Sequence, residues 1–246
     1  MEKTIKHIEQ LVNESRYLEA QYAVEDHVGD QLTQADKERL EQLKALSLSK
    51  IGDPQLALEF FEPRWRSHIN NSESAGIMGS IYKAIFIATK DPKYGKLSAN
   101  TYLESFNVTK SYYTGINAAT MSRIVGNSSA AKSIAKQIED ILLPLDRDFW
   151  EEGTLAECYL LLKNPEKATQ HYIRTREMMS SNWGTINSVH QQLWLLGHYT
   201  HVPKAIIEFF KPPKITAFIG EDGCFTEYKE TVSKPFLNIY LSLVFI

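Results

Sequence analysis

Hydrophobic and polar positions recur along the chain at helical spacing, and short turns separate the helical stretches. Several turns are followed by an alanine and, four residues later, by a second apolar residue. Apolar positions three and four residues apart share one face of a helix. The pattern therefore predicts antiparallel helix pairs, each joined by a short turn. The aligned alanines are Ala20, Ala57, Ala131, Ala168 and Ala205.

These alanines follow a single period. Three intervals between them are 37 residues, and the interval from Ala57 to Ala131 is twice as long, 74 residues. The missing repeat falls near residue 94, where Asp91 and Pro92 mark another turn. Proline is tolerated in the first turn of a helix but not in its interior, so the Asp-Pro and Asn-Pro pairs mark helix starts. A repeat of this length indicates stacked helical hairpins.

Two further columns fall in the first helix of each predicted hairpin, twelve and nine residues before the alanine. Small residues there let helix backbones approach closely, and large ones fill the gap between hairpins. The columns are Ile8, Ala45, Ala119, Ala156 and Leu193, and Leu11, Leu48, Ser122, Tyr159 and Leu196. We therefore expect an all-α, right-handed solenoid of about six hairpins over residues 1–212.

The repeat columns resemble those of tetratricopeptide repeats, although that family's period is shorter, about 34 residues. A more specific resemblance lies in the run YYTGIN, from Tyr112 to Asn117, with IYKAIFIATKDPKY before it and FWEEGTLAECYLLL after it. These segments resemble the TRAFs-binding domain of the apoptosis-signal-regulating MAP kinase kinase kinases and of its bacterial relatives. The resemblance covers roughly Met1 to Pro212 and implies a helical-repeat regulatory and docking module.

The YYTGIN run opens a predicted helix for which two interpretations stay open. In the first, the tyrosines pack between hairpins and Asn117 bonds to a neighbouring turn. In the second, Tyr113, Asn117 and Arg123 point into the concave groove, where solenoids take up peptides or nucleotides. The candidate partner-binding residues are Tyr112, Tyr113, Asn117 and Arg123.

Charge and cysteine content narrow the function classes. The net charge is -3 and no run of Lys and Arg stands out, which argues against nucleic acid and anionic lipid as partners. No run of 18 apolar residues occurs, so we expect no membrane span. The two cysteines, Cys158 and Cys224, are far apart and lack CxxC spacing. That argues against a disulfide framework and a zinc site and favours a cytoplasmic location.

Catalytic patterns are missing from the sequence. There is no Gly-rich phosphate loop and no HRD or DFG motif, so kinase chemistry is not carried over from the resemblance. His198 and His201 are three residues apart but lack an HExxH arrangement. Cys158 lies on an apolar helix face, where cysteine is usually a small buried hydrophobe. We expect no enzyme activity, no cofactor and no metal.

The last segment, 213–246, has a different character. Residues 214–219 read as a strand that runs into glycines, and residues 237–246 are apolar and β-prone. Three interpretations stay open: the truncated start of an α/β domain, a hairpin that caps the solenoid, or a strand that adds to another chain.

The sequence thus favours a non-catalytic interaction and regulatory scaffold that docks a protein partner and gates a signalling or defence effector, either fused or associated. The alternative is the sensor half of a nucleotide- or sugar-processing effector, whose α/β domain begins near Lys214. A third hypothesis is a homo-oligomer that uses the terminal strand as its contact.

Overall fold

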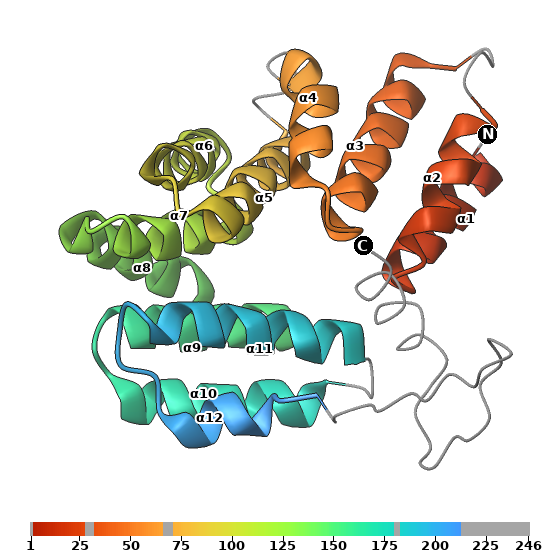
Figure 1. The fold of residues 1–246 in the computed structure, drawn as a ribbon. Helices are drawn as coiled ribbons and strands as arrows, with labels where there is room; N and C mark the ends of the chain where they lie inside the picture. Colours follow the sequence, from red (N-terminus) through yellow and green to blue (C-terminus); the bar gives the residue numbers. More distant parts are fainter. Residues whose placement is uncertain (1, 28–31, 66–70, 180–182, 213–246) are drawn as a thin grey trace, which may run out of the picture.

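The computed structural model describes residues 2–27, 32–65, 71–179 and 183–212 of the chain. Within these ranges the backbone forms twelve α-helices and no strand (Figure 1). The helices are α1 (Glu2–Asn13), α2 (Tyr17–Glu25), α3 (Gln34–Lys50), α4 (Pro54–Trp65), α5 (Ser72–Thr89), α6 (Pro92–Thr109), α7 (Tyr112–Ile124), α8 (Ser128–Leu142), α9 (Phe149–Leu161), α10 (Pro165–Met178), α11 (Trp183–Gly197) and α12 (Lys204–Phe209). The predicted all-α class is confirmed for the described ranges, and the predicted tail, 213–246, lies outside them.

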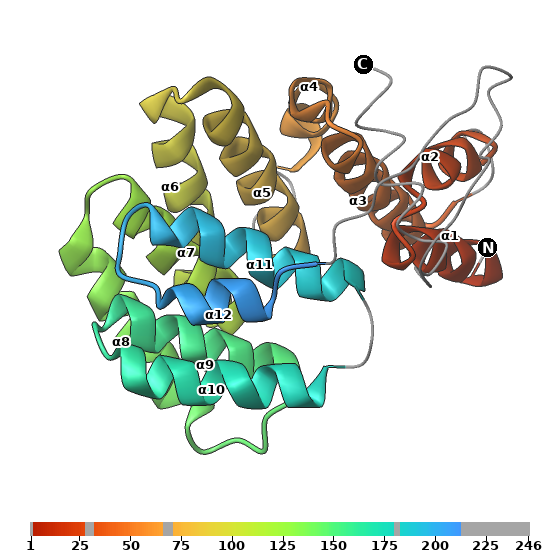
Figure 2. The same ribbon diagram turned by 60° about the horizontal axis from the view of Figure 1, so that its bottom comes forward.

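The odd-numbered helices form a layer in which each helix meets the next. Helix α1 packs on α3, α3 on α5, α5 on α7 and α7 on α9. Helices α2, α4, α6 and α8 pack between odd-numbered neighbours, α10 packs on α9, and α12 packs on α11. Figure 1 shows the chain curving from α1–α4 at one end, through α5–α8, to α9–α12 at the other. Figure 2 shows the same curve from a second direction. We call the odd-numbered helices the inner layer.

The repeat columns read from the sequence are buried. All ten residues of the two first-helix columns are buried, from Ile8 to Leu196. The turn alanines Ala20, Ala57, Ala131 and Ala168 are also buried. The core follows the stack, with one apolar cluster in α1–α3, a second mainly in α3–α5 and a third that runs from α5 to α12. Each repeat therefore buries its surface mainly against its neighbours.

The last repeat departs from the predicted columns by one residue. Ala205 and Phe209 are exposed, and their neighbours Ile206 and Phe210 take the buried places. The turn that precedes α12 spans residues 198–203, whereas the turn before α10 spans only residues 162–164. The longer turn changes where α12 begins relative to the repeat, which explains the shift.

The turns end and start helices as the sequence predicts. Pro92 and Pro165 occupy the first turns of α6 and α10, and Asp91 and Asn164 cap these helices by accepting from backbone N–H groups. The turn after the first helix of several repeats needs a left-handed residue. Gly52 (φ 105°), Gly126 (φ 91°), Lys90 (φ 59°) and Lys163 (φ 64°) hold that conformation.

The repeat count remains a prediction. Helix α12 has six residues and α2 has nine, whereas α5 and α6 have eighteen each. The short helices pair with their neighbours α11 and α1. The twelve helices are compatible with six hairpins, but the terminal pairs are much shorter than the central ones.

Candidate functional site

A chain of polar side chains runs across the inner layer. Lys83 in α5, Thr120 in α7 and Glu157 in α9 stand 37 residues apart, eleven positions before the turn alanine or its equivalent in each repeat. The Thr120 hydroxyl donates to Glu157 Oε1. Gln192 in α11 connects the two ends of this row of side chains. Its Nε2 donates to Glu157 Oε1 (2.8 Å), and its Oε1 accepts from Lys83 Nζ (2.9 Å). We call these four residues the inner-layer network.

The Lys83–Gln192 bond shows which side of the layer is concave. It joins α5 to α11, although α7 and α9 lie between them in the stack. Side chains of α5 and α11 can meet only if the row of odd-numbered helices curves and brings its distant members together. The side on which they meet is then the concave side. The network therefore lies inside the curve of the solenoid, the surface that such repeats present to ligands.

Burial shifts both ionisable groups of the network toward their uncharged forms. Burial raises the pKa of the Glu157 carboxyl, and hydrogen bonds from Thr120 and Gln192 and the charge of Lys83 offset only part of this effect. Burial also lowers the pKa of Lys83 to about 8, against the opposing charge of Glu157. The charge of Lys50, at the end of α3, lowers the pKa of Lys83 further. Perturbed groups of this kind gather at functional sites more often than elsewhere.

The predicted pair Tyr113 and Asn117 lies on α7, next to α5. Asn117 Nδ2 donates to the backbone oxygen of Tyr113 (2.9 Å). The Tyr113 ring lies against Gly76 of α5, so closely that a Cβ at that position would collide with it. Burial and the charge of Glu73 raise the pKa of Tyr113, yet 40% of the residue stays exposed. Tyr113 thus has both a fixed position and an accessible surface.

Tyr112 and Arg123 lie away from that pair. Tyr112 is half-buried, and burial followed by the charges of Asp148 and Glu151 raises its pKa, so its hydroxyl lies toward the start of α9. Arg123 lies in the last turn of α7, where it donates to Ser128 Oγ. The structure therefore brings Tyr113 and Asn117 together and separates them from the other two predicted residues. Their binding role stays a prediction.

A pocket of ≈ 240 Å³ opens between α1, α3 and α5. Arg39 lies in it and donates through Nε to Glu9 Oε1 (2.7 Å), and its Nη1 lies 3.5 Å from Glu73 Oε1. Beside it, Gln42 Nε2 donates to the buried Ser74 hydroxyl (2.9 Å). Two carboxylates already neutralise the arginine, so this pocket offers mainly an apolar wall with a paired charge.

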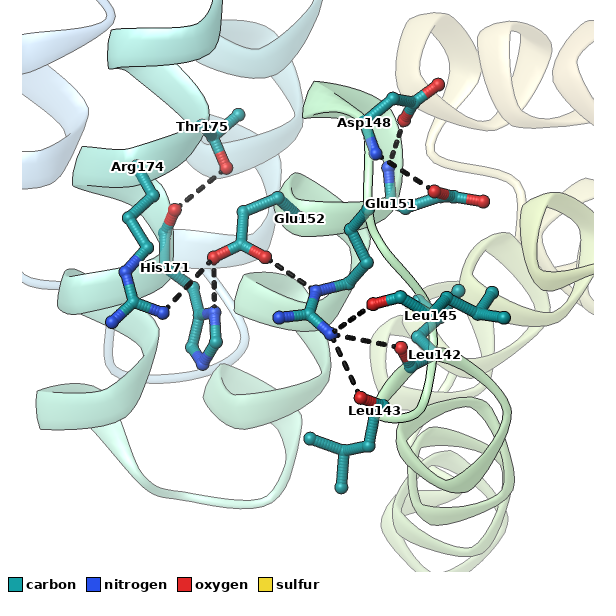
Figure 3. A network of polar contacts seen from close by, with 10 residues as sticks. Leu142, Leu143, Leu145, Asp148, Glu151, Glu152, His171, Arg174 and Thr175 are labelled. Atoms are coloured by element: carbon teal, nitrogen blue, oxygen red, sulfur yellow. Dashed lines mark hydrogen bonds and ion pairs between the residues drawn. The ribbon is translucent and has the colours of Figure 1, made fainter.

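A second carboxylate network stabilises the junction of α8, α9 and α10 (Figure 3). Glu152 accepts from Arg147 Nε (2.7 Å), and its other oxygen lies 2.7 Å from His171 Nδ1. Arg147 also donates to the backbone oxygens of Leu142, Leu143 and Leu145 at the end of α8. Burial alone would raise the pKa of Glu152, but the bonds from Arg147 and His171 prevail and lower it. Every charge here has a partner, which indicates a structural role.

The histidine and cysteine candidates take structural positions. His198 Nδ1 lies 2.8 Å from the backbone oxygen of Trp194, and its ring meets that indole edge-on. Cys158 is buried, and burial raises the pKa of its thiol well above the ordinary value. Among the described residues, no group of three or more His, Cys, Asp or Glu could hold a metal ion. Nor is any helix in these ranges long and apolar enough to cross a membrane.

Comparison with known proteins agrees with the repeat fold. A family model described as Tetratricopeptide Repeats-Sensor matches residues 5–122. A solved thermophilic tetratricopeptide repeat protein of Thermus thermophilus is similar over 78% of this chain and 98% of its own, with 16% identity and a TM-score of 0.60. A tetratricopeptide repeat protein of Parabacteroides merdae covers 85% of this chain and 96% of its own, with 12% identity and a TM-score of 0.29. A comparison with curated proteins finds no match.

These findings support the repeat class and not the finer resemblance. The sensor-repeat model covers α1 to most of α7, and the Thermus structure shares the overall fold. The resemblance to the TRAFs-binding domain is supported by neither finding and stays a prediction. The described part of the chain has the fold of tetratricopeptide-like helical repeats.

Proposed function

We propose that this chain is a non-catalytic, cytoplasmic interaction and regulatory scaffold. Its helical repeat domain, residues 1–212, docks a protein partner inside its curve and gates a signalling or defence effector that is fused or associated. The segment 213–246 then belongs to a separate unit. The inner-layer network is the observation that carries this proposal.

The network supports ligand docking because it is polar where a purely structural contact would be apolar. Buried polar groups cost stability unless their partners compensate them fully. In Lys83 and Glu157, both charged forms are disfavoured by burial despite their hydrogen bonds. A partner that adds hydrogen bonds or charge at this surface would gain free energy from the uncompensated groups. Neighbouring Tyr113 offers an exposed aromatic surface of the kind enriched in protein interfaces.

Site-specific photocrosslinking in the native cells tests this function. A photoreactive phenylalanine analogue replaces Tyr113, beside the inner surface, or Tyr22 of α2, which is 69% exposed, as the matched control. We expect one protein to be crosslinked at position 113 and not at position 22. Equal crosslinking at both positions, or none at position 113, would contradict docking inside the curve.

The second candidate function is the sensor half of a nucleotide- or sugar-processing effector, whose α/β domain begins near Lys214. The sensor description of the matching family favours it, as does the presence of Lys50 and Lys83 close together in the inner layer. Calorimetric titration of the full chain with nucleotides and nucleotide sugars tests it. Binding that is lost in Lys83→Met would support it, and no heat of binding with any of them would count against it.

A further inference from the structure

A second pocket lies at the turns of three successive repeats, away from the inner-layer network. Its lining residues are Arg123, Leu160, Lys163, Pro165, Thr200 and His201, and its volume is ≈ 350 Å³. We call it the turn pocket. Arg123 comes from the last turn of α7, Lys163 from the turn between α9 and α10, and His201 from the turn before α12. The pocket therefore depends on the stacking of the repeats and not on one local motif.

The lining of the turn pocket is basic, although the chain as a whole is slightly acidic. Its polar side chains are Arg123, Lys163, His201 and Thr200, and no carboxylate is among them. The whole chain carries a net charge of -3. A cluster of basic side chains without a carboxylate favours an anionic ligand.

The charges of the pocket are also not used elsewhere in the described ranges. Arg123 donates to the neutral Ser128 hydroxyl, and neither Lys163 nor His201 makes an ion pair there. Other basic residues of the same repeats do have acidic partners: Lys136 pairs with Glu139, and Arg147 with Glu152. The contrast separates the turn pocket from an ordinary surface rich in ion pairs.

Lys163 occupies a position at which glycine stands in two other repeats. Gly126 lies 37 residues earlier and Gly52 a further 74 residues earlier, both with left-handed backbones. Lys163 holds the same conformation at φ 64°, which disfavours any side chain with a Cβ. The local fold would therefore accept glycine here, so the Lys163 side chain can be removed without straining the turn.

We infer that the turn pocket binds a phosphate-bearing small molecule. The planar guanidinium of Arg123 suits two phosphate oxygens at once, and Lys163 adds a mobile positive charge. The Thr200 hydroxyl and the His201 ring offer further hydrogen bonds. Leu160 and Pro165 supply an apolar floor. The volume falls in the lower part of the range for small-ligand pockets, about 300–1,000 Å³, so there is room for an organic group beside the phosphate.

Nuclear magnetic resonance titration of the full chain tests this inference. Pyrophosphate is the first probe, with inorganic phosphate, ribose 5-phosphate and ribose as comparison arms and sodium sulfate as the ionic control. We expect saturable amide shifts at residues 160–164 and 200–201 with the phosphate compounds and none with ribose. Tighter binding of ribose 5-phosphate than of inorganic phosphate would identify an organic phosphate as the ligand. Equal binding would identify the phosphate group itself.

Lys163→Gly is the decisive variant because glycine suits the left-handed turn. We expect its melting temperature to equal or exceed that of the wild type, while pyrophosphate binds at least tenfold more weakly. Lys90→Gly is the matched control, since Lys90 holds the same conformation (φ 59°) and does not line the pocket. It should bind as the wild type does.

His201→Gln provides a second variant at an exposed position and should also weaken binding. Three outcomes would overturn the inference: no saturable shift at the pocket, equal binding by wild type and Lys163→Gly, or equal response to sulfate. The turn pocket shares no residue with the inner-layer network, so its failure would leave the proposed docking function untouched.

Discussion

Glu152 and Glu157 are buried carboxylates on the same helix, five residues apart, and their surroundings move their pKa values in opposite directions. Arg147 and His171 surround Glu152 closely enough to overcome the effect of burial. Glu157 accepts from a hydroxyl and an amide, and its nearby lysine cannot offset burial. The difference separates a carboxylate that stabilises the fold from one whose charge stays poorly compensated inside the curve.

The largest expected effect on stability comes from replacing Glu152, the carboxylate that stabilises the fold. Glu152→Gln removes a charge that bonds to Arg147 and His171, and leaves Arg147 half-buried without its acidic partner. We expect a loss of about 3 kcal/mol in the free energy of unfolding, measured by urea denaturation at neutral pH. Glu166→Gln, at an exposed position of α10, is the control and should change stability by less than about 0.5 kcal/mol. If Glu152→Gln lowers the free energy of unfolding by less than about 1 kcal/mol, Glu152 does not have the stabilising role assigned to it.

The next largest effect is on the pH dependence of stability, and it comes from the lowered pKa of Lys83. Its folded-state pKa of about 8 lies below the ordinary 10.5, so the unfolded chain binds more protons between these two values. The lysine therefore contributes stability that increases as pH rises from 8 to 10.5. We expect the unfolding free energy of the wild type to gain on the order of 2 kcal/mol over Lys83→Met across this window. Parallel pH profiles of the two proteins would contradict the burial of this ammonium.

The close contact between α5 and α7 has a smaller expected effect. Gly76→Ala places a Cβ against the Tyr113 ring and should cost about 1–2 kcal/mol, although alanine favours a helix more than glycine. In a Tyr113→Ala background the same change should be neutral or stabilising. A double-mutant cycle measured by thermal unfolding checks this. Equal costs in both backgrounds would show that Tyr113 does not occupy the space above Gly76.

The smallest change is expected at Glu157, and it is the counterpart of Glu152→Gln. Its raised pKa means that burial disfavours the ionised form above the ordinary value of 4.5. A neutral glutamine of similar shape should therefore change stability by less than about 1 kcal/mol at neutral pH. Relative to the wild type, the variant should gain stability as pH rises above 4.5. A loss as large as that of Glu152→Gln would mean that Glu157 is fully compensated.

Much of the fold could be predicted from the sequence because each repeat contacts mainly its neighbours. The columns from Ile8 to Leu196 follow from a fixed spacing, and the structure buries all of them. The shift from Ala205 to Ile206 could not be predicted in this way, because it depends on the longer turn before α12. The length of a turn follows from the ends of its flanking helices, and the sequence pattern alone did not fix those ends.

The inner-layer network was missed for a related reason. The spacing of Lys83, Thr120 and Glu157 is visible in the sequence, at the same period as the alanines. Gln192 stands outside that spacing and joins the network because the solenoid curves. Curvature accumulates from small rotations between repeats, and no local pattern of residues reports it. Tyr113 was identified from its run of residues, whereas its fit against Gly76 needed the packed helices.

The most direct test of the comparison is the titration of both carboxyl groups by carbon-13 nuclear magnetic resonance, assigned with Glu152→Gln and Glu157→Gln. The account predicts that Glu152 titrates below 4.5 and Glu157 above it. If Glu157 titrates at or below 4.5, its charge is compensated within the fold, and the inner-layer network loses its claim to be a ligand surface.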